Sequence, residues 1–330
     1  MRGGGLLGLN LGRGSGRLSC VSNQSNQSQG SGKAFSLALG AYVIWGVFPV
    51  LMKPLLGMST VVFICARGLS CALFSFLVLF LMRRGAALRL LLGSPRALGV
   101  LLVACVLIAA NWWLYFDAIQ GKNLSEASIG YFLLPLLQVL FGWVFLRERL
   151  NGLQKIALGL CVGTVAWRVW HTGSLNSVSL LIALSFGLYG VVRKLGVRHL
   201  PQLRDASSTL GVESLFTGLL TLPLVFLWQA PLHVPVDAGT WTAMGIMGVA
   251  TAIPLMLWVA AAGGLSLSTL GMLQYISPSI QLVLSALVYG EVIRSDQVTM
   301  AVLLVVALLV YVQGCRREAA TVSSDGGAAS

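Results

Sequence analysis

One arginine stands in the middle of a long apolar run, where a charged side chain is costly. Arg67 lies within TVVFICARGLSCALF, and an arginine at the centre of a membrane costs about 2.5–3.5 kcal/mol. We therefore expect it to face the protein interior beside an acidic partner, with Glu213, Glu126 and Asp117 as candidates. Such a pair is either structural, or the guanidinium binds a carboxylate or phosphate of a ligand. In the second case a nearby acid is a candidate proton carrier for coupled transport.

Two prolines sit in the middle of apolar runs, one in each half of the chain. Pro135 and Pro278 each remove a backbone donor and free a carbonyl one turn earlier. In hydrocarbon that carbonyl must be satisfied by protein or by cavity water. Each proline is expected to kink its helix, either as an ordinary packing feature or as part of a binding site. The nearby glutamines either line such a site or form hydrogen bonds between helices. The polar side chains on the two proline faces are Tyr131 with Gln138, and Gln274 with Gln281.

Three further residues are candidates to line a cavity. Trp45 lies in a glycine-containing run, Asn111 opens a run beside two tryptophans, and Tyr275 neighbours the second proline face. Asn111 is suited either to lining a pocket or to bonding between helices. The predicted lining residues are Trp45, Arg67, Asn111, Tyr131, Gln138, Glu213, Gln274 and Tyr275. The predicted helix-breaking or gating positions are Pro135, Pro278, Gly130 and Gly271.

The residues that usually carry catalysis form no recognisable constellation. The three histidines, His171, His199 and His233, all lie in predicted loops, which favours neither a metal site nor a catalytic base. The six cysteines contain no C-x-x-C pair, and four of them lie inside apolar runs, so buried free thiols are expected. We expect no metal, no cofactor other than a coupling proton or ion, and no enzymatic activity.

These residues must be positioned by membrane helices. Of the 330 residues, 57% are hydrophobic and only 10% are charged, which is too few for a water-soluble globule or a disordered chain. The apolar runs are continuous and helix-length, unlike the alternating strands of a membrane β-barrel. We predict an all-α integral membrane protein whose ten transmembrane helices lie near residues 34–52, 58–82, 97–119, 126–146, 154–171, 177–193, 208–229, 239–262, 265–289 and 297–314.

The basic residues indicate orientation rather than nucleic-acid binding. With both ends of the chain inside, 17 of the 22 Lys and Arg residues fall in the inner loops and tails, against four outside: Lys53, Lys122, Arg168 and Arg294. Because Lys and Arg concentrate on the cytoplasmic side, we expect both termini in the cytoplasm. Glu148 and Glu291 begin loops beside arginines, and we expect them to form interfacial salt bridges.

The two halves of the chain repeat one pattern. Trp45-Gly46 aligns with Phe186-Gly187, and both halves contain P-x2-Q-x9-E, running from Pro135 and from Pro278. Each half has five helices, and because five is odd the second half enters the membrane from the opposite side. We therefore predict a 5+5 inverted repeat. Its predicted parts are a disordered cytoplasmic tail (1–33), two five-helix repeats (34–173 and 174–316) and a cytoplasmic tail (317–330).

An inverted repeat favours transport, because two halves that exchange conformations open a central site alternately to the two sides. We predict a permease for a small-molecule substrate, embedded in the lipid bilayer as a monomer or homodimer, without a nucleic-acid partner. One rival is a membrane accessory or sensor protein, which co-purification of a stoichiometric partner would favour. Another is a membrane-embedded enzyme, for which we find no catalytic constellation.

Five stretches carry a resemblance to a known family. The stretches, which span residues 41–291, are AYVIWGVFP, ANWWLYFDAIQGKNLSEASIGYFLLPLLQVLFGWVFLRERLNGLQ, SFGLYGVVRK, VESLFTGLLTLP and TAIPLMLWVAAAGGLSLSTLGMLQYISPSIQLVLSALVYGE. They resemble the RarD group of bacterial EamA-type transporters in the drug/metabolite transporter superfamily. The resemblance implies ten helices, a bacterial inner-membrane location, cytoplasmic termini and secondary transport of small metabolites or drugs. The group's usual label, "chloramphenicol-sensitive protein", names a phenotype and not a substrate.

The match is not complete at the central arginine. The family pattern there is His-Arg, and Ala66 stands in place of the histidine, so a proton-coupling role of that histidine does not carry over. Glu213 matches the family's acid in the seventh segment, and Lys194 matches the Arg-Lys after the sixth.

Overall fold

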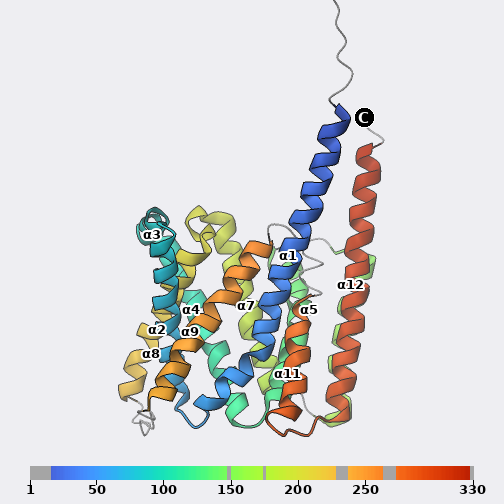
Figure 1. The fold of residues 1–330 in the computed structure, drawn as a ribbon. Coiled ribbons are helices and arrows are strands. Elements are labelled where there is room, and N and C mark those ends of the chain that lie inside the picture. The colour runs from blue at the N-terminus through green and yellow to red at the C-terminus, as the bar shows by residue number, and fades with distance from the viewer. Residues whose placement is uncertain (1–15, 147–149, 174–175, 228–236, 263–272, 328–330) are drawn as a thin grey trace, which may run out of the picture.

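The computed structural model describes residues 16–146, 150–173, 176–227, 237–262 and 273–327, and these residues form helices and no strand (Figure 1). The first half contains α1 (Gly16–Met52), α2 (Thr60–Leu81), α3 (Gly85–Leu92), α4 (Pro95–Gln120), α5 (Leu124–Leu146) and α6 (Gly152–Thr172). The second contains α7 (Ser177–His199), α8 (Ala206–Leu227), α9 (Ala238–Ala262), α11 (Ile276–Leu287) and α12 (Ser295–Gly327). The short 3₁₀ helices are η1 (Lys53–Leu55) and η2 (Pro201–Arg204).

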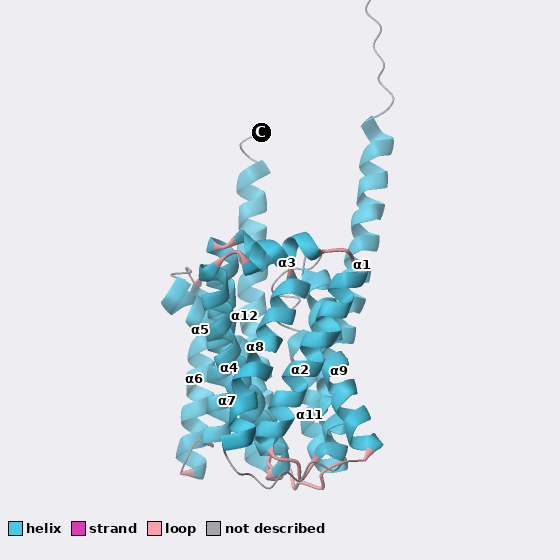
Figure 2. Ribbon diagram, turned by 90° about the vertical axis from the view of Figure 1, so that its left-hand side faces the viewer, coloured by secondary structure: helices cyan, strands magenta, loops and turns pink. Residues whose placement is uncertain are grey.

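Eight of the described helices are long and apolar enough to cross a membrane. The other two predicted segments are occupied by α6, which has 21 residues, and by α11, which has 12. The terminal helices are longer than predicted, since α1 includes residues 16–33 of the predicted tail and α12 continues to Gly327. The short α3 was not predicted as a separate element. Figure 2 shows it lying across one end of the bundle.

Helix contacts follow the predicted repeat. If α7 to α12 correspond in order to α1, α2, α4, α5 and α6, then α2–α8, α5–α11 and α6–α12 are contacts between equivalent helices. The contact of α1 with α9 has its counterpart in α7 with α4, and that of α5 with α7 in α11 with α1. A set of contacts that is unchanged when the halves are exchanged is what a pseudo-two-fold axis produces. The 5+5 inverted-repeat membrane fold is confirmed.

Glycines allow close contacts between helices. A Cβ on Gly68 of α2 would come within 2.8 Å of the backbone nitrogen of Gly218 on α8, and one on Gly130 of α5 within 2.6 Å of the Ser179 carbonyl on α7. Small residues let helix backbones approach in this way where lipid provides no hydrophobic driving force. These contacts hold α2 against α8 and α5 against α7.

The two ends of the bundle differ. The start of α1 and the end of α12 lie at the same end as α3, at the top of Figure 1, and we call this the terminal end. The opposite far end holds η1 and the turns that precede α5, α7 and α12. Large apolar side chains such as Leu73, Phe80 and Trp170 are exposed, as a lipid-facing surface requires. The four described cysteines are buried free thiols, as predicted.

Candidate functional site

Arg67 is buried on α2 without an acidic partner. It is only 7% exposed, and its Nε donates to Thr251 Oγ1 on α9 at 3.1 Å. Two aromatic rings lie against the guanidinium, Trp112 at 4.0 Å and Phe48 at 4.7 Å from ring centroid to Cζ. Within the described ranges the Arg67 side chain makes no other hydrogen bond and no ion pair. The expected pairing with Glu213, Glu126 or Asp117 is therefore wrong.

The three candidate acids are engaged or placed elsewhere. Asp117 is exposed near the end of α4, while Glu126 is bound within a separate network at the far end. Glu213 is 3% exposed, and its Oε2 lies 3.3 Å from Nη1 of Arg193 on α7. Arg193 also donates to Thr209 Oγ1 at 3.1 Å. The acid of α8 is thus neutralised by a different arginine, which leaves the charge of Arg67 uncompensated.

A neutral polar chain lies next to Arg67. The Tyr131 hydroxyl on α5 donates to Asn111 Oδ1 on α4 at 3.1 Å, and Asn111 Nδ2 donates to Ser185 Oγ on α7 at 3.1 Å. Tyr131 and Tyr115, whose rings meet edge to face, are near enough to interact electrostatically with Arg67. The structure therefore brings three predicted residues, Arg67, Asn111 and Tyr131, into one region, which we call the Arg67 site. The aromatic residues Trp112 and Phe48 complete it.

The remaining predicted lining residues are dispersed. Trp45 packs with Tyr42 and Trp258, and Tyr275 packs against Phe132 in another core cluster. Among the described residues, neither Gln274 nor Gln138 forms a hydrogen bond to the Arg67 site, and Gln138 is exposed. The repeat counterpart of Gln138 behaves differently, because Gln281 is buried and its Nε2 donates to the Trp45 carbonyl at 3.0 Å. Its role fits the interhelical bond that the sequence analysis left open.

The two prolines have unequal local effects. α5 continues through Pro135 to Leu146, whereas the ninth helix is interrupted at Tyr275, three residues before Pro278, and resumes as α11. Gly130 packs α5 against α7 rather than breaking a helix. Its repeat counterpart Gly271 lies outside the described residues.

A second buried charged cluster lies at the far end, and the sequence analysis missed it. Arg168 of α6 is 2% exposed, with Nη2 at 2.6 Å from Glu126 Oε1 and Nε at 3.4 Å from Asp296 Oδ2 of α12. The other Glu126 oxygen accepts from Ser179 of α7 at 2.9 Å, and Gln297 donates to Oε1 at 2.9 Å. We call these five residues the Arg168 network. The count of basic residues places Arg168 in an outer loop, although it lies within the predicted segment 154–171. Its position inside that segment is the feature of the sequence that indicates a buried charge.

Glu291 joins the two halves at the same end. Its Oε1 and Oε2 accept from the backbone nitrogens of Leu124 and Ser125 at 2.6 and 2.8 Å, so it caps the start of α5. Cap bonds of this kind satisfy backbone donors that the helix leaves free, and the negative charge suits a helix start. The expected salt bridge of Glu291 is replaced by this cap, while Glu148 lies outside the described residues. A polar pocket of about 280 Å³ adjoins the cap.

The comparisons with known proteins identify the family. The model of the EamA-like transporter family matches twice, at residues 32–169 and 175–313. An uncharacterized transporter of Pseudomonas aeruginosa is 37% identical over 84% of this chain and 93% of its own length. Protein RarD of Escherichia coli is 32% identical over 84% and 92% of the two chains.

Other matches agree with this assignment. An uncharacterized transporter of Bacillus subtilis is 34% identical over 78% of this chain and 86% of its own length. One solved structure, described only as "Crystal structure of protein", superposes with a TM-score of 0.59 at 18% identity, over 84% of this chain and 96% of that one, and this likeness shows the fold alone. With its two family matches and its membrane-length helices, this multi-pass membrane protein belongs to the EamA-like transporter family.

Proposed function

We propose that the protein is a secondary-active permease, RarD-like, that moves a small metabolite or drug carrying an anionic group. The family assignment supports transport, and the exchangeable helix contacts support alternating access between two five-helix halves. Protein RarD relatives at 32–34% identity support the RarD-like assignment. Within the described residues, the absence of an acid beside Arg67 is the single observation that carries the substrate class.

The argument for an anion is energetic. A buried cation retains a large desolvation cost unless an opposite charge or good hydrogen bonds offset it. Cation–π contacts with Trp112 and Phe48 offset part of this cost, by about 2 kcal/mol when desolvated. They provide no hydrogen-bond acceptor for the two terminal nitrogens, and an arginine binds carboxylates and phosphates through two parallel hydrogen bonds. A substrate anion would therefore complete the coordination of Arg67.

The neighbouring groups fit a polar substrate. The Tyr131–Asn111–Ser185 chain runs from α5 through α4 to α7, and it offers hydroxyl and amide groups beside the charge. Pockets of this kind usually combine aromatic walls with a few fixed polar groups. Glu213 is our candidate for carrying a coupled proton, because its Oε2 is buried without a hydrogen bond and its partner Arg193 is part-exposed.

Alternating access assigns a role to the far end. Glu291 and the Arg168 network tie α5 to α6, α7, α12 and the turn before α12. Opening of the Arg67 site to this side requires the cap of Glu291 to separate from α5, since Glu291 and Leu124 belong to different halves. We assign the described structure to a state that is closed at the far end.

We place the permease in the bacterial inner membrane, with both termini in the cytoplasm. The excess of basic residues in the loops of the terminal end supports this orientation. The relatives are named as transporters, which supports transport over catalysis. An accessory or sensor role is the alternative, and a stoichiometric partner that co-purifies would favour it.

The test combines binding and transport. Purified protein in detergent is screened by thermal shift against amino acids, organic acids, sugars and amphenicol antibiotics at two pH values, since a bound ligand raises the melting temperature. A hit is then followed into proteoliposomes. Arg67→Gln is the test variant, and Arg83→Gln, an exposed arginine just beyond α2, is the control. We expect binding and transport of an anionic compound to be lost only in the first. Wild-type transport of that compound by Arg67→Gln would overturn the proposal.

A further inference from the structure

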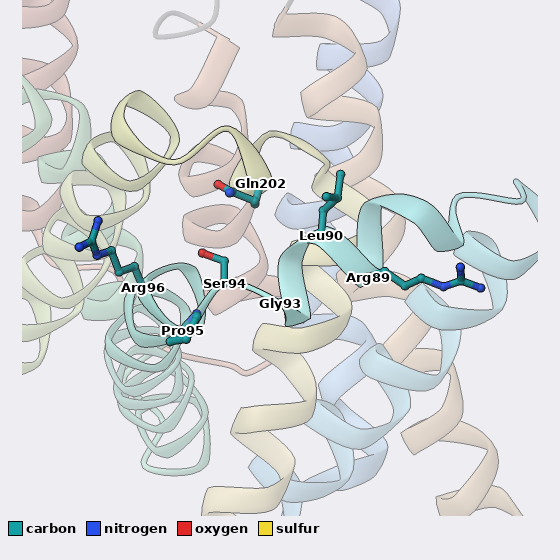
Figure 3. A pocket seen from close by; sticks show the side chains of 7 residues that line it. All are labelled: Arg89, Leu90, Gly93, Ser94, Pro95, Arg96 and Gln202. Carbon is teal, nitrogen blue, oxygen red and sulfur yellow. The ribbon is translucent and has the colours of Figure 1, made fainter.

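A groove at the terminal end is not used by the proposed transport site. It has a volume of about 580 Å³ and lies where the turn between α3 and α4 meets η2. Figure 3 shows Arg89 and Arg96 at opposite ends of the groove, with their side chains extended away from each other and with Ser94 and Gln202 between them. Both arginines are exposed, and in the part of the chain that the structure describes neither forms an ion pair.

The charge around this groove is strongly positive. The segment from Arg83 to Arg96, which contains α3, has four arginines and no acidic residue. The segment 194–204 also has no acidic residue, and its basic residues are Lys194, Arg198, His199 and Arg204. The nearby carboxylate, Asp205, is already bound to Arg84 at 2.8 Å and to Ser208. An anion that enters the groove therefore meets no free carboxylate within the described residues, and the two unpaired, exposed arginine side chains at its ends can turn toward it.

The groove also has neutral hydrogen-bonding groups. Gln202 Oε1 is buried without a hydrogen-bond partner, and the side-chain Nε2 of this residue is a donor that a phosphate oxygen can accept from. The Ser94 hydroxyl oxygen accepts from the Ala97 backbone nitrogen and retains its proton as a donor. Phosphate oxygens accept from guanidinium, amide and hydroxyl donors alike.

The floor of the groove is held in place by packing. Leu91 of α3, Ala97 of α4 and Leu203 of η2 are buried together in one cluster. The Arg84–Asp205 bridge adds a link between the start of α3 and the end of η2. A groove on such a floor is preformed, so a ligand would not have to order the surrounding loops before binding.

The groove lies beside exposed apolar side chains, which favours a lipid headgroup over a soluble phosphate as its ligand. α3 buries Leu91 but leaves Leu90 68% exposed and Leu92 52% exposed. Phe80 and Leu81, at the end of α2, are also exposed. Apolar side chains that face acyl chains, with arginines at the same level as the helix ends, are the pattern of an interfacial helix beside headgroups. Basic pockets at this depth on the cytoplasmic side bind anionic headgroups.

We propose that the groove formed by Arg89, Ser94, Arg96 and Gln202 binds the phosphate headgroup of an anionic phospholipid. The two arginines bind the phosphate charge, the serine and glutamine bind its oxygens, and Leu90 and Leu92 contact the acyl chains. The lipid would fix α3 and η2 to the membrane surface. This site is separate from the Arg67 site, and its test does not depend on any transported substrate.

The test uses delipidated protein in detergent, titrated with phosphatidylglycerol or with phosphatidylcholine. Bound lipids are counted by native mass spectrometry, and affinity is taken from the rise in melting temperature. We expect phosphatidylglycerol, and not phosphatidylcholine, to bind and protect the wild-type protein. Arg89→Gln with Arg96→Gln should weaken that affinity at least about tenfold, because it removes the charge-assisted hydrogen bonds to the phosphate.

A double variant of equal charge provides the control. Arg83→Gln with Arg198→Gln removes two exposed arginines from the same end that do not line the groove. We expect it to retain wild-type affinity within about twofold. An equal loss of affinity for phosphatidylglycerol in both double variants would show that the lipid is attracted by the overall surface charge and not by this groove. That result would overturn the proposal. Protection by inorganic phosphate as strong as that by phosphatidylglycerol would also overturn it, because the ligand would then be a soluble phosphate.

Discussion

Two arginines of this protein are buried in apolar helices, and they are held in opposite ways. Arg168 is 2% exposed and meets two carboxylates, Glu126 and Asp296, at 2.6 and 3.4 Å. Arg67 is 7% exposed and meets two aromatic rings and one threonine hydroxyl. The first has its charge compensated by the protein, and the second does not.

The difference separates a structural role from a binding role. Arg168 and its partners come from α5, α6, α7 and α12 and link both halves at the far end. Removing one partner from such a cluster leaves a buried charge uncompensated, which is expensive. Arg67 already lacks an opposite charge, so the folded protein loses little when it is neutralised. The following predictions test this contrast, starting with the largest expected effect.

Arg168→Met should destabilise the protein by about 3–5 kcal/mol, because it leaves Glu126 buried without its cation. Asp296 keeps a second cation, since Arg294 binds both of its oxygens at 2.9 and 3.0 Å. The measurement is unfolding of purified protein in detergent, by heat or by increasing denaturing detergent. The double variant Arg168→Met with Glu126→Gln should recover part of the loss, since it removes the stranded charge of Glu126. A melting temperature of Arg168→Met equal to the wild-type value would show that the network does not stabilise the fold.

Arg67→Met should leave the melting temperature of the ligand-free protein unchanged or higher, because it removes an uncompensated buried charge. The same variant should bind the anionic ligand found in the screen about 100-fold more weakly, the loss expected for two charge-assisted hydrogen bonds. Melting temperatures with and without ligand measure both effects. A fall in ligand-free stability as large as that of Arg168→Met would make Arg67 structural and remove the contrast between the two arginines.

The sequence predicts the fold of this protein better than the contacts of its two buried arginines. The ten apolar runs predicted the helices, and the two copies of P-x2-Q-x9-E predicted the repeat. Each run and each copy of the motif is a local pattern that can be recognised in a short stretch of sequence. The isolation of Arg67 could not be predicted, since it depends on Arg193 binding Glu213 from a neighbouring helix. The partners of Arg168 come from positions 126 and 296, and no local pattern links them to residue 168.

Part of the missed information was present in the chain. Gln154 and Gln297 align in the repeat, and the structure uses both as caps, since each Oε1 accepts from the backbone nitrogen three residues earlier, that of Asn151 at 2.8 Å and that of Arg294 at 2.9 Å. This alignment therefore predicted an equivalent contact in the two halves. The alignment of Gln138 with Gln281 did not, because the first is exposed and the second is buried.

Glu291→Gln should weaken the cap at the start of α5, because an amide oxygen accepts the backbone bonds of Leu124 and Ser125 more weakly than a carboxylate. We expect the far end to open more often, with a cost of about 1.5–3 kcal/mol to the closed state. A cysteine at Ser125 should then react several-fold faster with a membrane-impermeant maleimide, compared with Ser125→Cys alone. An unchanged labelling rate would show that Glu291 does not hold this end closed.

Arg84→Gln gives the smallest expected effect and extends the comparison to an exposed pair. Arg84 is 49% exposed at its side chain, so its bridge to Asp205 should contribute only about 0.2–1 kcal/mol. Partial burial acts to raise the pKa of Asp205, but hydrogen bonds from Ser208 and Arg84 outweigh it and lower that pKa below its usual value. A lowered folded-state pKa contributes stability above the unfolded-state pKa and loses it as the pH falls. The difference in melting temperature between wild type and Arg84→Gln should therefore be small at neutral pH and vanish when Asp205 is protonated. A large difference in melting temperature that does not change with pH would show that an exposed ion pair can stabilise this protein as much as a buried one. Burial would then not explain the large effect expected for Arg168.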